Sequence, residues 1–249
     1  MKIEKITKKK NKYLLELSNG DKINTYDEVI LKNNLLFHKE LSNDLIKKIM
    51  EENTYYEIYS KVIKYVSTKL RSEEEIKKYL VKLNCNDISK IIKDLKDKKI
   101  INDLIFVKSY INDKILLTLD GPYKIKKNLL EHNIEEEIID EELKAFKDEI
   151  IEEKINKIIS KRLKTNKKST YIFKQKMINE LVNLGYDKYK SIEILNDFKL
   201  DESKSIEKDY NILYKKLSKK YKDEELAYMI KNKLYQKGYS LDTINEIIN

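Results

Sequence analysis

The chain has 249 residues, of which 41% are hydrophobic and 38% charged, and it carries a net charge of +9. Its single cysteine, Cys85, excludes an internal disulfide. It has no apolar leader and no apolar run of roughly 18 residues, which predicts a soluble, cytoplasmic protein with no membrane segment. Four glycines and one proline leave few helix breakers, which favours a mainly α-helical fold over an all-β one.

Residues 1–53 differ from the rest and are predicted to form a small β-rich extension. Short strands are expected around Ile3, over 13–17 and over 22–26. Asn19 and Gly20 lie between the last two strands and predict a hairpin turn in which both residues have φ > 0.

Two helices are expected to close the extension. A short one is predicted over 27–32, and Ser42 is placed to cap a second, with Asp44 in its first turn. Two or three strands are marginally stable alone. The extension is therefore expected to pack on the following helices or on a partner.

From residue 54 onward one pattern occurs four times, about fifty residues apart. Its apolar anchors are Ile76, Ile125, Met177 and Ile230, which are separated by 49, 52 and 53 residues. A fixed period of this size is typical of a tandem array, in which each unit buries its apolar face on its neighbours. Such arrays expose a large surface, and they usually bind macromolecules rather than enclose a small substrate.

Each repeat is predicted to contain three helices, with the anchor on the second. Ser72 and Glu75 form a capping box at the start of one such helix. The left-handed conformation that ends a helix is expected at Gly185 and Gly238, and also at two asparagines, Asn84 and Asn133. The predicted domains are the extension, 1–53, and four three-helix repeats, 54–102, 103–146, 147–203 and 204–249.

Charge is distributed in blocks of opposite sign. Residues 131–153 contain eleven acidic residues and two lysines, whereas 161–176 contain seven basic residues and no acid. Residues 204–222 contain seven basic and two acidic residues. A compositional bias toward Lys, Ile and Asn is the alternative explanation for the lysine count, so the clustering is more informative than the total.

Four segments of the repeats carry motifs in a fixed order. Residues 69–80 contain an Arg-Ser-Glu segment that closes with Tyr-Leu, and residues 101–107 are similar to an Asp-x-x-Phe-Ala segment. Residues 121–129 contain a Gly-x-x-x-Ile-x-x-x-Leu helix, and residues 237–244 are similar to a closing Arg-Gly-Phe/Tyr-Ser-x-x-x-Ile segment. In this order the motifs resemble those of the RecX family, regulators of the RecA recombinase. The likeness covers about 55–249, and it is looser in the extension. The chain departs from the pattern at Val107, where Ala is usual, in its few arginines, and at Asn84 and Asn133, where Gly is common.

The resemblance implies a non-enzymatic regulator of homologous recombination and DNA repair. It implies a curved array of three-helix units that contacts the RecA filament and modulates its activity, usually as an inhibitor. No cofactor is implied, and a monomer is expected. Single- or double-stranded DNA is a further candidate partner through the basic blocks.

Candidate partner-binding residues are the basic side chains of the repeats. For Arg71 the alternative is an intramolecular pair with a nearby acid, and for the lysine blocks it is a solvated surface. Most tyrosines recur at helical spacing, which favours packing over base stacking. The candidates are Arg71, Lys77, Lys78, Lys126, Lys127, Lys161, Arg162, Lys164, Lys167, Lys168, Lys215, Lys216, Lys219 and Lys220.

Catalytic chemistry has little support in the sequence. His38, His132 and Cys85 are isolated, so neither a metal site nor a cysteine nucleophile is predicted. No phosphate-binding glycine loop is present in the sequence. The rival hypothesis is a generic helical-repeat scaffold that binds an acidic protein and has no DNA role.

Overall fold

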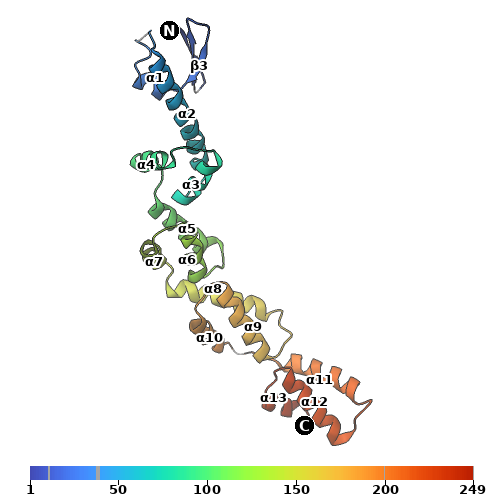
Figure 1. Cartoon of the computed structure of the whole chain (residues 1–249). Coiled ribbons are helices and arrows are strands. Elements are labelled where there is room, and N and C mark those ends of the chain that lie inside the picture. The colour runs from blue at the N-terminus through green and yellow to red at the C-terminus, as the bar shows by residue number, and fades with distance from the viewer. Residues whose placement is uncertain (11, 38–39, 199, 249) are drawn as a thin grey trace. The chain divides into compact units, whose positions relative to one another are not determined.

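The computed structural model describes residues 1–10, 12–37, 40–198 and 200–248 (Figure 1). The chain divides into two compact units, Met1–Phe106 and Val107–Asn249. The first holds a small sheet and its neighbouring helices, and the second is helical (Figure 1). This confirms the mainly α fold with a β-rich N-terminus.

The N-terminal sheet has three antiparallel strands in the order β1-β2-β3. The strands are β1 (Ile3–Lys9), β2 (Lys12–Leu17) and β3 (Lys22–Thr25). The hairpin between β2 and β3 is confirmed, but the expectation of two left-handed residues in its turn is wrong. Gly20 has a φ of +87°, whereas φ of Asn19 is not positive. The loop spans 18–21, and the Asn19 side chain accepts a hydrogen bond from the amide of Asp21 at 3.1 Å. This side-chain contact shapes the turn, so only one residue needs the left-handed region.

One long helix connects two cores of the first unit. The short α1 (Asp27–Lys32) is followed by α2 (Asn43–Val66). Ser42 caps the start of α2, and its hydroxyl accepts a hydrogen bond from the amide of Leu45. Ile49 of α2 is buried with the apolar faces of the sheet and α1. About three turns further on, Tyr59 and Val62 are buried with the next two helices. The expected boundary at 53/54 therefore lies inside α2.

The remaining helices form triplets, each around a buried cluster where one is described. In the first unit, α3 (Glu73–Lys82) and α4 (Ile88–Asp97) pack on the end of α2. The predicted capping box at the start of α3 is present, with both of its hydrogen bonds. The later triplets are α5 (Asp103–Leu117), α6 (Pro122–Leu130) and α7 (Glu136–Leu143), then α8 (Asp148–Leu163), α9 (Thr170–Asn183) and α10 (Lys188–Asn196), and finally α11 (Ser203–Leu217), α12 (Asp223–Gln236) and α13 (Leu241–Ile248).

The predicted helix stops all adopt the left-handed conformation. φ is +52° at Asn84, +54° at Asn133, +88° at Gly185 and +84° at Gly238. The second helices nevertheless differ in length. α9 and α12 have 14 residues each, whereas α3 has 10 and α6 has 9. Because each anchor lies eight residues before its stop, the extra turn of α9 and α12 lies at the start of the helix.

Within the second unit, the start of the second helix in one triplet contacts the C-terminal end of the second helix in the next triplet. The amide of Gly121 donates to the carbonyl of Leu184 at 2.6 Å, and the amide of Tyr123 donates to that of Gly185 at 3.0 Å. One repeat later, the Ser169 hydroxyl donates to the carbonyl of Lys237 at 2.7 Å. The first junction, between α6 and α9, is thus made by main chain on both sides, and the second, between α9 and α12, uses a side chain.

Candidate macromolecule-binding surface

Two lysine clusters occupy equivalent positions in the second unit, each covering the end of a triplet's first helix and the loop that leads to its second helix. We call them the α8–α9 corner (Lys161, Lys164, Lys167, Lys168) and the α11–α12 corner (Lys215, Lys216, Lys219, Lys220). All eight side chains are exposed. No ion pair is recorded for them within the described part of the chain. In the view of Figure 1, both loops lie on the side of this unit away from α10 and α13.

The ends of α8 and α11 contribute to this placement. Both helices direct their C-terminal carbonyl ends toward a lysine-bearing loop, where cations are favoured by the helix dipole. The α8–α9 corner continues directly into Ser169, which is buried at the junction with Lys237. The α8–α9 corner is therefore anchored at a packed helix junction, while its lysine amines remain in solvent.

The two arginines are engaged within the molecule. Arg162 makes a bidentate contact with the carboxylate of Glu180, with Nη2 at 2.6 Å and Nε at 2.9 Å. The Arg71 guanidinium lies 4.0 Å from the centre of the Tyr65 ring, and its Nη1 lies 3.2 Å from Glu75 Oε1. Its side chain is only 15% exposed, so Arg71 has the intramolecular pair considered as the alternative.

Three of the four remaining candidates also pair with acids. Lys77 lies 2.7 Å from Glu73 and Lys78 lies 3.4 Å from Glu74, each one helical turn away. Lys126 lies 2.6 Å from both Glu136 and Asp140 of α7, and the hydrogen bonds to these acids raise its pKa. Lys127 is exposed, with no ion pair recorded in the part of the chain that the structure describes. The structure thus distinguishes the unpaired corner lysines from Lys77, Lys78 and Lys126, which pair with acids.

The tyrosines divide into buried and exposed groups. Tyr186 and Tyr239 are buried, and their hydroxyls donate to the Leu119 carbonyl and the Asp209 carboxylate. In contrast, the side chains of Tyr123, Tyr171 and Tyr235 are about 60% exposed (61%, 59% and 60%). Packing therefore explains only some of the tyrosines, and the sequence interpretation missed the exposed ones. Tyr123 and Tyr171 share a place that sequence could have shown, the second residue of a second helix.

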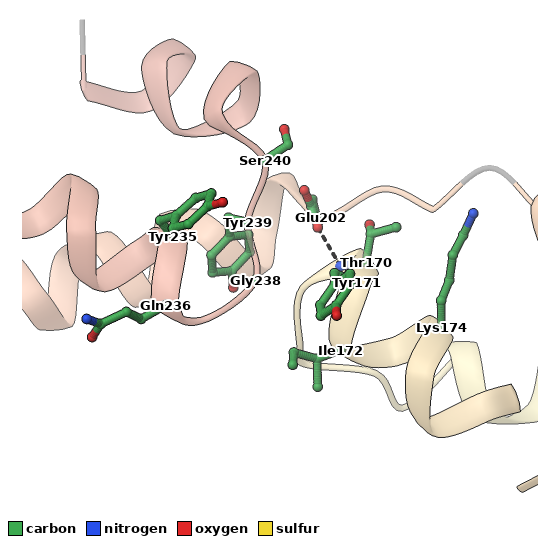
Figure 2. A pocket seen from close by; sticks show the side chains of 10 residues that line it. All are labelled: Thr170, Tyr171, Ile172, Lys174, Glu202, Tyr235, Gln236, Gly238, Tyr239 and Ser240. Atoms are coloured by element: carbon green, nitrogen blue, oxygen red, sulfur yellow. Dashed lines mark hydrogen bonds between the residues drawn. The ribbon is translucent and has the colours of Figure 1, made fainter. Parts of the chain in front are cut away.

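A cavity of about 790 Å³ lies at the junction between α9 and α12. Figure 2 shows that its lining comes from the start of α9, from the end of α12 and the residues that follow it, and from Glu202. Glu202 Oε2 accepts a hydrogen bond from the amide of Thr170 at 2.6 Å, which joins the segment before α11 to the start of α9. The lining residues are Thr170, Tyr171, Ile172, Lys174, Glu202, Tyr235, Gln236, Gly238, Tyr239 and Ser240.

Among the described residues, no cluster of His, Cys, Asp or Glu could hold a metal ion. His38 lies outside the described residues. Within the same residues, no helix is both long and apolar enough to cross a membrane.

Helical triplets that carry unpaired lysines at equivalent positions define a helical-repeat protein. No family model matches the chain, but relatives do. It is 32% identical to a regulatory protein RecX of Streptococcus agalactiae, over all of this chain and 98% of the relative. It is 31% identical to one of Streptococcus pneumoniae, over 98% of this chain and 97% of the relative. The chain belongs to the RecX family of regulatory proteins.

Solved structures agree with this assignment. A crystal structure of regulatory protein RecX matches with a TM-score of 0.70 and 26% identity, over 79% of this chain and 99% of that one. The crystal structure of RecX from Lactobacillus salivarius matches with a TM-score of 0.52 and 26% identity, over 58% of this chain and 95% of that one.

Proposed function

We propose that the protein binds RecA or the RecA–DNA filament and inhibits its recombinase activity. In this role it acts without catalysis, as a regulator of homologous recombination and DNA repair. The proposal rests on membership of a family of regulatory proteins, together with the resemblance of its repeat motifs to regulators of RecA. The single structural observation in its favour is the pair of unpaired lysine corners on successive repeats.

The corners provide attraction to a polyanion. A RecA–DNA filament offers phosphates and acidic protein surface. A lysine amine can contact either group, because it is a point charge on a flexible side chain and, unlike arginine, does not require a fixed bidentate geometry. Phosphate contacts are independent of base sequence and release counterions, so they weaken steeply with salt. The corners are therefore suited to bringing the protein to a filament at any sequence.

The direct test is RecA ATP hydrolysis on single-stranded DNA, with this protein titrated into preformed filaments. We expect the rate to fall at substoichiometric ratios, because one bound regulator affects the neighbouring filament subunits. Strand exchange should fall in parallel. An unchanged rate at equimolar protein and low salt would refute the proposed function.

A pull-down separates this function from that of a generic scaffold for an acidic protein. The immobilised protein should recover RecA in the presence of single-stranded DNA and ATP. Recovery of acidic proteins without RecA would favour the scaffold hypothesis instead.

A further inference from the structure

The cavity between α9 and α12 has exposed aromatic walls. Tyr171 lies at the start of α9 and Tyr235 near the end of α12, and in the view of Figure 2 Gly238 and Tyr239 lie between their rings. A Cβ on Gly238 would lie 3.2 Å from Cδ1 of Tyr171 and from Cγ1 of Ile172. The absence of a side chain at this helix stop therefore helps to keep the cavity open.

The walls are fixed by contacts that do not involve the exposed rings. The Ser169 hydroxyl donates to the carbonyl of Lys237, and the Tyr239 hydroxyl donates to Asp209 at 3.0 Å. Glu202 accepts from the Thr170 amide and, at 3.3 Å, from the Thr243 hydroxyl. The cavity is thus largely pre-formed, which lowers the entropic cost of filling it.

The chemistry of the lining favours an apolar occupant. Both carboxylate oxygens of Glu202 accept hydrogen bonds, and the Lys174 amine donates to Asn196 Oδ1 at 2.9 Å. The lining also has the exposed rings of Tyr171 and Tyr235 and the half-buried Ile172 side chain. Its exposed polar residues, Gln236 and Ser240, make hydrogen bonds to Lys233 and Thr243. The Glu202 carboxylate disfavours a phosphate group inside. A large aliphatic or aromatic side chain fits both the volume and the polarity.

The lysines that directly precede the cavity lining in the chain indicate the charge of the rest of the ligand. Lys164, Lys167 and Lys168 are exposed and lie in the loop that leads directly into Ser169 and Thr170. No acid occurs anywhere in residues 161–176. A segment that enters the cavity from this side meets unpaired cations, so acidic residues beside its apolar anchor are favoured.

From this geometry we propose that the cavity is a docking site for an acidic segment of a partner protein, which inserts one large apolar side chain between Tyr171 and Tyr235. The proposal rests on the proposed function, because the partner in its test is the RecA filament. Buried tyrosines at the centre of an interface are frequent hot spots, whereas tyrosines outside the site contribute little.

The test compares Tyr235→Ala with Tyr228→Ala. Both residues lie on α12, and Tyr228 is 64% exposed but does not line the cavity. Binding to RecA filaments on single-stranded DNA and to naked single-stranded DNA is measured for each variant. We expect Tyr235→Ala to weaken filament binding at least tenfold and to leave binding to naked DNA unchanged. Tyr228→Ala should match the wild type in both assays.

Two results would overturn the inference while the proposed function stands. One is filament binding by Tyr235→Ala within twofold of a wild type that itself binds. The other is an equal loss on naked DNA, which would assign the cavity to a nucleic-acid base. If the wild type does not bind the filament, the proposed function fails and the inference fails with it.

A second measurement does not depend on how the alanine variant folds. p-Benzoylphenylalanine placed at position 235 should photocrosslink to a RecA peptide that contains acidic residues beside an apolar one. Crosslinks to DNA, to a peptide without acids, or to nothing in the filament would each contradict the proposed docking site.

Discussion

At the residue scale, the junction between α6 and α9 depends on the absence of a side chain at Gly185. Its φ is +88°, and a Cβ there would lie 2.3 Å from the amide nitrogen of Lys124. Gly20 has nearly the same φ, +87°, but a Cβ there would meet nothing within 4 Å. Substitutions at Gly20 and Gly185 therefore separate the free-energy cost of a left-handed backbone from that of a steric clash.

We expect Gly20→Ala to lower the free energy of unfolding by about 1 kcal/mol, because only the backbone conformation is strained. Gly185→Ala should cost about 3 kcal/mol or more, because the main chain at the start of α6 must also move. Denaturant unfolding and hydrogen exchange at α6 and α9 measure the difference. Equal losses of stability in the two variants would show that the steric clash at the junction is relieved without a cost in free energy.

Through the Asp120 carboxyl group in the α5–α6 loop, the stability of the fold is expected to depend on pH. Burial alone raises the pKa of its carboxyl group, but hydrogen bonds from Lys124 and Lys114 outweigh burial and lower the pKa below the ordinary value of 3.8. The lysine amines lie 2.7 and 3.0 Å away. A carboxyl group with a lowered folded-state pKa stabilises the fold above its unfolded-state pKa, and this contribution is lost as pH falls through the folded-state pKa.

Asp120→Asn should therefore be less stable than the wild type above about pH 5, and the gap should close as the pH falls below about 4. Urea unfolding of both proteins across this range measures the gap. Asp113→Asn is the control, since Asp113 is an exposed residue of α5, the helix that precedes this loop. This control should remain within about 0.5 kcal/mol of the wild type. A gap that persists unchanged to pH 3 would mean that the Asp120 ion pairs contribute nothing.

At the scale of elements, α2 is the structural connection within the first unit. It contributes Ile49 to the core under the sheet, and Tyr59 and Val62 to the core with α3 and α4. Thr54 lies between these contacts on the exposed side of the helix, and its hydroxyl donates to the carbonyl of Met50.

Thr54→Pro should destabilise the unit by about 3 kcal/mol or more, because proline removes a helical hydrogen bond and clashes with the preceding turn. Thr54→Ala removes only the side-chain hydrogen bond and serves as the control. Native-state hydrogen exchange should show lost protection on both sides of residue 54. Loss confined to one side would indicate that the two cores fold independently of α2.

At the scale of the whole molecule, the position of a lysine should matter more than its charge. We expect Lys161, Lys164, Lys167 and Lys168 changed together to Gln to weaken filament binding and to make its dependence on log salt shallower. Each lost phosphate contact lowers that slope by about 0.7 to 0.9. The fold should persist, since these side chains are exposed.

The matched control changes four exposed lysines of the first unit, Lys5, Lys9, Lys47 and Lys48, to Gln. It removes the same charge, so binding by the control should remain near the wild type. If both naked DNA and filament binding fall in the corner variant, the corner contacts phosphate, and if only filament binding falls, it contacts RecA. Equal weakening in the control would mean that net charge alone accounts for the attraction.

Features that depend on near neighbours in the chain can be predicted from the sequence alone. The anchors Ile76, Ile125, Met177 and Ile230 are all buried, as the period predicts. The capping box and the left-handed stops follow from residue types within one or two helical turns, where backbone geometry leaves few alternatives. The turn at Asn19 was predicted incorrectly because one side-chain contact was enough to change its geometry.

Which charged and aromatic side chains are accessible depends instead on contacts between segments that are distant in the sequence. Arg162 pairs with Glu180, 18 residues away, and Lys126 pairs with Asp140, 14 residues away, whereas the corner lysines remain in solvent. The cavity joins residues 68 positions apart, through the contact of Ser169 with Lys237. Such contacts depend on how one helix packs against another, and a period of 3.6 residues specifies the buried face of each helix but not its partner.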